Sequence, residues 1–491
     1  MPLRGYDMGA VAFAEKFRRC KVTQFLARAL SSYYFPLVSA ILTVSCYYLG
    51  WDMVLVWYLL LSGTAVLLCC DDITPVFLVV LLLNILLSMK HSPMYAEDKG
   101  YFMRPAILAQ EVIAALLIIF SAIFRLVMAL IQRKFKPDMT FWSVVILTVT
   151  FMLAGLFYSH YTVNNLIYGF ISAVLLIGVY IVIGCGVKNN KQNFFKIAIY
   201  LLAQFAVAAI ELIVAYITYD GLIVNGKVIR DRLFFGWGTY NQMGLVLILS
   251  IPAWFYLASK YKYGVFFLLG GLADVAMCYL SMSRQAMMMS VVLTAGCCIW
   301  LLICDKGRKR LINTCVMAAA IVALVILLII FRKDVKVFFS SVLHSLGTGS
   351  GRLSLWRMGW ENFLKKPIFG IGWYNPCALP QEPGYISSAA PMATPWMCHN
   401  TIVQILNSCG LVGLIAYAVH RTQTVISVIN RPTAERIFIG LTMCAMLLVC
   451  LLDIHIFRFF PMTVYGILLA LLSVGENDGQ GDKKCKERSI I

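Results

Sequence analysis

Long apolar runs separated by short polar segments are the feature that most constrains this chain. About 20 apolar residues in a helix cross the hydrocarbon core of a bilayer. The 491 residues are 61% hydrophobic and only 13% charged, whereas a soluble domain carries about a quarter of its residues as charge. The chain is therefore predicted to be an integral membrane protein, and a large soluble domain is excluded.

The apolar runs predict an all-α fold, a polytopic transmembrane helical bundle of about 12–14 spans. A helix suits this environment because it satisfies its backbone polar groups internally, where no water is available. The predicted spans are residues 34–50, 53–70, 73–89, 106–124, 140–158, 166–187, 194–219, 238–258, 263–280, 285–304, 311–331, 399–420, 436–452 and 459–474.

The net charge of +18 is read as a topology signal once its distribution is examined. Segments on alternate sides of the spans hold 26 and 15 of the 41 Lys and Arg residues. Since Lys and Arg collect on the cytoplasmic side, the N-terminal segment 1–33 and the tail 475–491 are both predicted to be cytoplasmic. Nucleic acid is not expected as a partner.

One long outside loop, residues 332–398, interrupts the otherwise short connections. It divides a predicted membrane core, 236–474, which follows the N-terminal helices 34–235. Within the loop, apolar and charged residues alternate at three- and four-residue spacing, which predicts an amphipathic helix at the membrane interface. Its apolar face comprises Leu353, Trp356, Trp360, Phe363 and Leu364, and its charged face comprises Arg357, Glu361 and Lys365.

The sixteen cysteines do not indicate a disulfide framework, because most of them fall inside apolar spans or on the cytoplasmic side. There they are expected to be small buried hydrophobic residues. Cys377 and Cys398 both fall in the long outside loop, which leaves a bridge between them open. No Cys/His spacing typical of a metal site occurs.

Several motifs on the outside face resemble a known family. They are SMSRQA at 281–286, GSGRLSLWRMGWENFLKKPIFGIGW at 349–373, HNTIVQILNSCGLVGLIAY at 399–417 and the upstream GWGTYNQMG at 236–244. In order and spacing they are similar to the O-antigen ligase and polymerase superfamily of bacterial polysaccharide assembly. The resemblance covers residues 236–417.

The resemblance implies a membrane glycosyltransferase. Such an enzyme moves a glycan from a polyprenyl-diphosphate carrier, undecaprenyl diphosphate, to an acceptor hydroxyl on the outer side of the cytoplasmic membrane. The implied partners are this lipid-linked oligosaccharide, a glycan, lipid or protein acceptor, membrane lipids and other polysaccharide-assembly proteins. Because a lipid diphosphate is already a good leaving group, the protein must mainly position it and neutralise its charge.

Arginine suits that task, since its planar guanidinium binds phosphate oxygens bidentately. Arg284 is the strongest candidate, in a short turn between two spans with no carboxylate nearby in sequence. Arg352 opens the amphipathic helix, where free backbone N–H groups also attract an anion. Two other interpretations stay open: Arg284 as an interface residue that only reaches toward the headgroups, and Arg352 as a solvated helix start.

Further substrate-binding candidates are weaker. Pairing with Glu361 would explain Arg357, and a solvated loop around Asp231 would explain Arg230 and Arg232. The motifs add Asn241 and Asn400. Asp453, His455 and Arg458 lie together in the last outside turn, where they could serve the site or pair with one another.

His399 is the candidate catalytic base. Histidine accepts a proton near neutral pH without a large shift of its pKa, and His399 lies where the long loop re-enters the membrane. A histidine beside an asparagine at a helix start could instead be a cap or a surface residue. The sequence also leaves open whether His399 abstracts a proton or only orients the acceptor.

The outside segments contain no Asp-x-Asp pair of the kind that holds a divalent cation against a diphosphate. Asp71 and Asp72 are adjacent but are predicted to be cytoplasmic. The sequence therefore predicts metal-independent catalysis without a cofactor, in which arginines take the role of the cation.

Two other classes of function remain. A flippase for lipid-linked sugars should contain repeated halves, and no clear repeat is visible; a non-catalytic scaffold would not need arginines and a histidine concentrated on one face. If the protein is an enzyme, the number of predicted spans, about fourteen, is larger than the roughly twelve expected of a ligase of this family. This favours a repeat-unit polymerase, with a ligase that attaches finished glycan as the alternative.

Overall fold

The computed structural model describes fourteen stretches of the chain and confirms the helical fold class. These stretches are residues 16–87, 105–132, 135–159, 161–188, 190–218, 222–224, 227–229, 233, 240–333, 336, 340, 352–373, 398–430 and 432–474. Arg230, Arg232 and Cys377 lie outside them, so the predictions that concern these residues stay predictions.

The helices are α2 (Lys21–Leu30), α3 (Tyr34–Leu49), α4 (Asp52–Cys69), α5 (Val76–Leu87), α6 (Pro105–Ile131), α7 (Met139–Met152), α8 (Val163–Ala173), the π-helical turn η2 (Val174–Gly178), α9 (Val179–Gly186), α10 (Lys191–Thr218), α11 (Tyr240–Lys260), α12 (Val265–Leu280), α13 (Arg284–Cys304), α14 (Gly307–Ile330), α16 (Arg352–Lys365), α17 (Thr401–Ile429), α18 (Ala434–Cys450), the 3-10 turn η5 (His455–Phe457) and α19 (Phe459–Val474). A short antiparallel hairpin, β1 (Ile223–Val224) and β2 (Lys227–Val228), is the one sheet of the described residues.

Each predicted span coincides with a helix, but the helices differ in length. Within the described residues, eight helical segments are long and apolar enough to cross a membrane, or nine if the bent pair α2 and α3, at 73°, counts as one span. Three further apolar helices, α7, α12 and α19, are shorter. At 1.5 Å per residue, the 14 residues of α7 extend about 21 Å, less than the hydrocarbon core of a typical bilayer.

Side-chain caps explain where several helices begin. Asp138 Oδ1 accepts the backbone N–H of Phe141 at the start of α7 (2.7 Å), and Thr433 Oγ1 accepts that of Arg436 at the start of α18 (3.2 Å). Each cap satisfies a backbone donor that has no partner within its helix.

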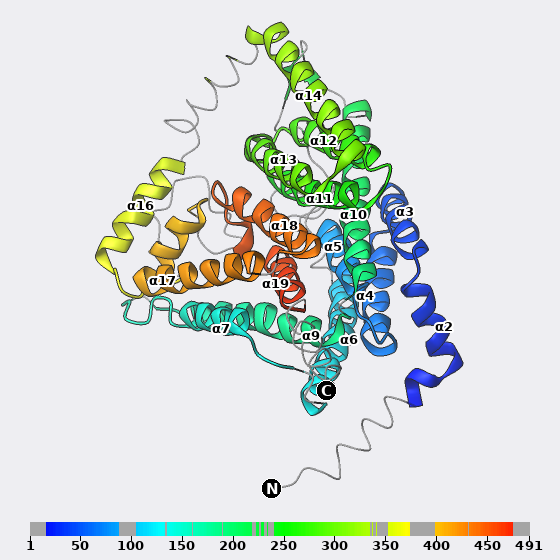
Figure 1. Ribbon diagram of the computed structural model, residues 1–491. Coiled ribbons are helices and arrows are strands. Elements are labelled where there is room, and N and C mark those ends of the chain that lie inside the picture. Colours follow the sequence, from blue (N-terminus) through cyan, green and yellow to red (C-terminus); the bar gives the residue numbers. More distant parts are fainter. Residues whose placement is uncertain are drawn as a thin grey trace, which may run out of the picture.

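Helix α11 is the most buried candidate span, with 83% of its apolar window inside the protein. It packs against α10, α12, α13 and α18. On another side of the molecule α7 runs along α17, and α16 lies against the first part of α17 (Figure 1). The turns that precede α13, α17 and α19 carry the candidate site.

Helix α17 is broken at Gly410, whose φ of 62° and ψ of −155° are not helical. The loop after α16 pairs with the backbone groups that the break releases. Leu411 N donates to Pro367 O (2.7 Å), and Gly372 N donates to Ser408 O (2.9 Å). A side chain at position 410 would meet Ile368 O at 2.5 Å from its Cβ. The loop therefore takes the place of the missing helical hydrogen bonds, as an apolar environment demands.

Candidate active site

The turn before α13 carries the first predicted arginine. Ser283 caps the helix through its hydroxyl, which accepts the N–H of Ala286 (3.4 Å) and donates to Asn241 Oδ1 at the start of α11 (3.2 Å). Met282 has a φ of 57°, in the left-handed region. Arg284 is the first residue of α13 and is partly buried. The hydrogen bond between Ser283 and Asn241 thus joins the start of α13 to the start of α11, where two of the predicted motifs lie.

The start of α17 carries the predicted base. Asn400 is the N-cap: its Oδ1 accepts the N–H groups of Ile402 and Val403 (2.9 and 3.0 Å), and its Nδ2 donates to Leu451 O (3.0 Å). His399 precedes the cap with a φ of 49°. The capping role thus falls to Asn400, and the imidazole of His399 is left for other contacts.

The turn between α18 and α19 supplies a carboxylate for that imidazole. His399 Nδ1 lies 3.2 Å from Asp453 Oδ1, which also accepts the N–H of Ile454 (2.8 Å). The Asp453 side chain is 3% exposed, whereas that of His399 is 34% exposed. An ionised carboxylate only accepts hydrogen bonds, so His399 donates from Nδ1 and presents the lone pair of Nε2.

A second histidine lies against the other carboxylate oxygen. His455 is buried, and its Nε2 is 3.5 Å from Asp453 Oδ2. The same Nε2 is 3.3 Å from Gln285 Nε2, in the residue that follows Arg284. Residues far apart in sequence, in the SMSRQA turn, the start of α17 and the last turn, are therefore brought together.

The surroundings in this cluster lower the pKa values of its two buried groups, Asp453 and His455. Burial raises the pKa of Asp453, but the neighbouring His455, His399 and Arg458 outweigh burial and hold this pKa well below its usual range. Burial lowers the pKa of His455 to about 4, with Arg458, His399 and Arg352 acting in the same direction against Asp453. Near neutral pH, Asp453 is ionised and His455 is neutral.

Helix α16 forms at the predicted place, and its predicted apolar face is divided between the protein interior and the surface. Gly359 and Phe363 are buried, and a side chain at 359 would meet Val403 and Cys398 on the α17 side within 3 Å of its Cβ. Leu353, Trp360 and Leu364 are exposed. Gly359 thus lets α16 approach α17 closely. Of the predicted apolar face, Phe363 is buried and Trp356 is partly buried.

The arginines of α16 lie in different surroundings. Arg357 Nε donates to Glu361 Oε1 (2.9 Å), and its side chain is 82% exposed. Arg352, partly buried, lies near enough to His455 to lower the pKa of that histidine. The predicted pair with Glu361 is thus present, and of these two arginines only Arg352 acts on the histidine cluster in this way.

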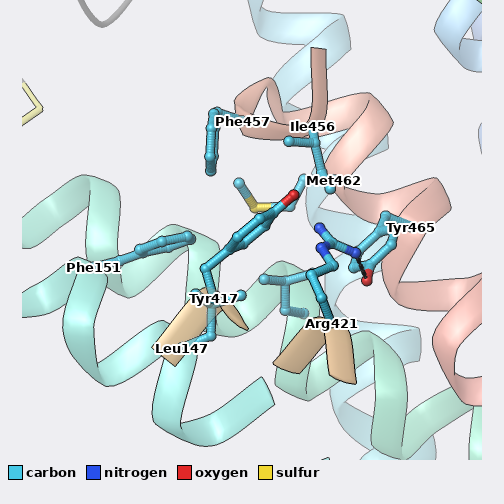
Figure 2. Close-up of a pocket in the computed structure, with 9 residues that line it drawn as sticks. Leu147, Phe151, Tyr417, Arg421, Ile456, Phe457, Met462 and Tyr465 are labelled. Atoms are coloured by element: carbon cyan, nitrogen blue, oxygen red, sulfur yellow. Dashed lines mark hydrogen bonds between the residues drawn. The ribbon is translucent and has the colours of Figure 1, made fainter. Parts of the chain in front are cut away.

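A second buried polar cluster joins α7, α17 and α19. Arg421 lies over the rings of Tyr417 and Tyr465, 4.4 and 4.8 Å from their centroids, and donates to the hydroxyl of Tyr465. Figure 2 shows the guanidinium pointing toward that hydroxyl, below Ile456 and Met462. Arg421, Tyr417 and Tyr465 line a small crevice together with two residues of η5, Ile456 and Phe457. This cluster was not predicted from the sequence.

Sequence reasoning found the participants of the histidine cluster unevenly. His399 was predicted, and Asp453, His455 and Arg458 were noted as a constellation of open role. Gln285 was missed, although its place directly after Arg284 was an available signal. Among the described residues no group of three or more His, Cys, Asp or Glu is placed to hold a metal ion.

Residues 265–418 match a protein family described as O-antigen ligase. The matched range includes Arg284, Arg352, Arg357, His399 and Asn400. It ends before the turn that holds Asp453. No curated protein matches the chain. The family match supports the resemblance to the O-antigen ligase and polymerase superfamily, and with it a membrane glycosyltransferase of that general type.

Proposed function

On the premise that residues 265–418 form an O-antigen ligase domain, we propose that this protein transfers a glycan from a polyprenyl-diphosphate carrier, undecaprenyl diphosphate, to an acceptor hydroxyl. The observation that carries the proposal is the pairing of His399 with Asp453 beside the Arg284 turn. A partly exposed imidazole held by a buried carboxylate is the arrangement of a general base.

In the proposed reaction the acceptor oxygen attacks the anomeric carbon of the donor sugar. The bond from that carbon to the diphosphate oxygen breaks, and the lipid diphosphate leaves with the electron pair. His399 Nε2 takes the hydroxyl proton, while Asp453 holds the ring through Nδ1 and stabilises the imidazolium that forms. No other reactant is needed.

The arginines serve the leaving group. Arg284 and Arg352 are proposed to bind the diphosphate oxygens and to offset their growing charge, with Arg357, Arg230 and Arg232 as further contacts to donor or glycan. Asn241 and Asn400 also remain substrate-binding candidates, although both amides already hold turns of the site. The proposal requires no metal ion or cofactor.

The proposed location is the cytoplasmic membrane, with both termini cytoplasmic and the site on the outer side. The excess of Lys and Arg on one set of connecting segments supports this orientation. Donor, acceptor, surrounding lipids and other polysaccharide-assembly proteins would meet the enzyme there.

Polymerase and ligase differ only in the acceptor. The number of predicted spans favours a polymerase that joins repeat units, and this is the form we propose. The description of the matched family favours a ligase that attaches finished glycan to a lipid or protein anchor. A flippase is a more distant alternative, because transport requires neither a base nor its carboxylate.

The test is the surface glycan of a strain that lacks this gene, rescued by wild type, Arg284→Ala or His399→Ala. Single repeats without long chains would mean polymerase, and long chains stranded on the carrier would mean ligase. Both variants are expected to fail in rescue while reaching the membrane in normal amount. Full rescue by both would overturn the proposed site.

A further inference from the structure

His455 is buried at the centre of the site, yet the proposed reaction gives it no task. Its side chain is 1% exposed, and its Nε2 lies near both the Asp453 carboxylate and the Gln285 amide. Burying a second imidazole against a carboxylate requires compensating contacts, so its contacts indicate what it does.

The ring nitrogen that faces Asp453 must carry a proton. If Nε2 of His455 were unprotonated, its lone pair would face Asp453 Oδ2 at 3.5 Å, which is repulsive. With the proton on Nε2, the amide of Gln285 should present its oxygen to the ring. Gln285 Oε1 is otherwise buried without a hydrogen-bond partner. Rotating the amide, whose oxygen and nitrogen are assigned from their partners, lets its oxygen accept from Nε2 of His455.

The contacts then form a chain across three elements. Gln285 at the start of α13 orients His455, His455 faces one oxygen of Asp453, and the other oxygen of Asp453 holds His399. Since Gln285 follows Arg284 directly, the chain joins the arginine turn to the base.

We propose that His455, held by Gln285, is a positioning residue that fixes the Asp453 carboxylate and thereby couples the Arg284 turn to the orientation of His399. The inference rests on the proposed glycosyl transfer and adds a residue that acts through Asp453 without touching the substrate.

The electrostatic surroundings limit how His455 can act. The groups that act on its charge are Asp453, His399, Arg458 and Arg352, and with burial they leave its pKa lowered to about 4. His455 is therefore neutral near neutral pH and carries no charge that would hold the carboxylate ionised. Its effect on Asp453 is then the fixed geometry of their contact, and removing it should lower kcat.

The experiment measures glycan transfer by the full-length protein in detergent or vesicles, with a synthetic polyprenyl-diphosphate-linked donor. The variants are His455→Leu, which has no donor, His455→Gln, which restores one, Gln285→Met and the double variant Gln285→Met/His455→Leu. His420→Gln is the matched control, because His420 is also a buried histidine with two hydrogen-bond partners, Ser143 and Tyr465.

For His455→Leu we expect kcat to fall about 10- to 100-fold, with KM for the donor nearly unchanged. His455→Gln should recover part of kcat. The double variant should be no worse than His455→Leu alone, because the two residues act in one chain. His420→Gln should leave kcat nearly unchanged.

Recovery of kcat in His455→Gln separates a positioning role from a loss of folded protein. A loss of kcat that parallels a loss of melting temperature, with no recovery in His455→Gln, would overturn the inference. Additive effects in the double variant would do the same. If His399→Ala and Arg284→Ala were also active, the proposed function itself would fail; if they were inactive, only the positioning role would.

Discussion

At the scale of the residue, two side chains occupy strained backbone positions beside the site. Met282 and His399 are the non-glycine residues with positive φ in the described part of the chain, at 57° and 49°. Such a conformation costs on the order of 1–3 kcal/mol for a residue other than glycine. One precedes Arg284 by two positions, and the other is the proposed base, so the strain coincides with the two motifs that form the site.

Replacing His399 by Asn or by Ala separates its chemical role from its backbone role. Both variants lack the proposed base, so activity should fall by about 10²–10⁴ in each. Asparagine tolerates the left-handed region better than alanine does, so His399→Asn should melt nearer to wild type. Thermal unfolding in detergent and a transfer assay check the two expectations. Equal melting temperatures would contradict the backbone argument, and an active His399→Asn would contradict the base.

At the scale of the element, the break in α17 is stabilised by the loop that follows α16. The loop 367–372 pairs with the backbone on both sides of Gly410. It also connects α16 to the first part of α17, where Ile371 N donates to Asn407 O (2.9 Å). The glycine is required by its φ of 62° and by the close approach of Ile368 O.

Gly410→Ala should therefore destabilise the protein by several kcal/mol, since it adds backbone strain and a steric clash with another backbone segment. Gly296→Ala, in the middle of α13, is the matched control, because a Cβ there meets nothing within 4 Å. The control should be neutral or slightly stabilising. Comparison of melting temperatures tests this, and an equal response of the two variants would refute it.

In the second polar cluster, the hydroxyl of Tyr465 connects α19 to His420 and Arg421 of α17. Ser143 Oγ donates to Thr140 O (2.7 Å) and lies 2.9 Å from His420 Nδ1, so the proton of that contact belongs to the histidine. His420 Nε2 then accepts from Tyr465 (2.8 Å), whose oxygen accepts from Arg421.

Tyr465→Phe should leave Nε2 of His420 without its hydrogen-bond donor and remove the hydroxyl to which Arg421 donates, at a cost of about 1–3 kcal/mol. Tyr417→Phe keeps a ring under the guanidinium and should cost less. Comparison of the melting temperatures of the two variants tests this expectation. A larger decrease in melting temperature for Tyr417→Phe would contradict the role of the Tyr465 hydroxyl in this cluster.

At the scale of the whole molecule, the basic charge and the placement of the cluster are consistent with one orientation. The turns before α13, α17 and α19 converge, whereas the segments predicted for the opposite side together hold 26 of the 41 Lys and Arg residues. Arginines near a lipid diphosphate would supply positive charge without a divalent ion.

Transfer activity of the purified protein should therefore persist in excess chelator. The measurement is glycan transfer before and after chelation, with magnesium or manganese added back. Loss of activity that either ion restores would refute metal independence, whereas loss that neither restores would point to damage by the chelator.

The amino-acid sequence alone determined the membrane class, the helical elements and the motifs that contain Arg284, Arg352 and His399. These follow from local patterns, because apolar length and helical periodicity act within one segment. Only the tertiary structure decided which partner each group has. Asp453 faces His399 across 54 positions, and Gln285 faces His455 across 170. Such contacts depend on how helices pack, and no spacing along the chain encodes them. The packing face of α16 was decided in the same way, because Gly359 allows a closer approach to α17 than the larger apolar residues do.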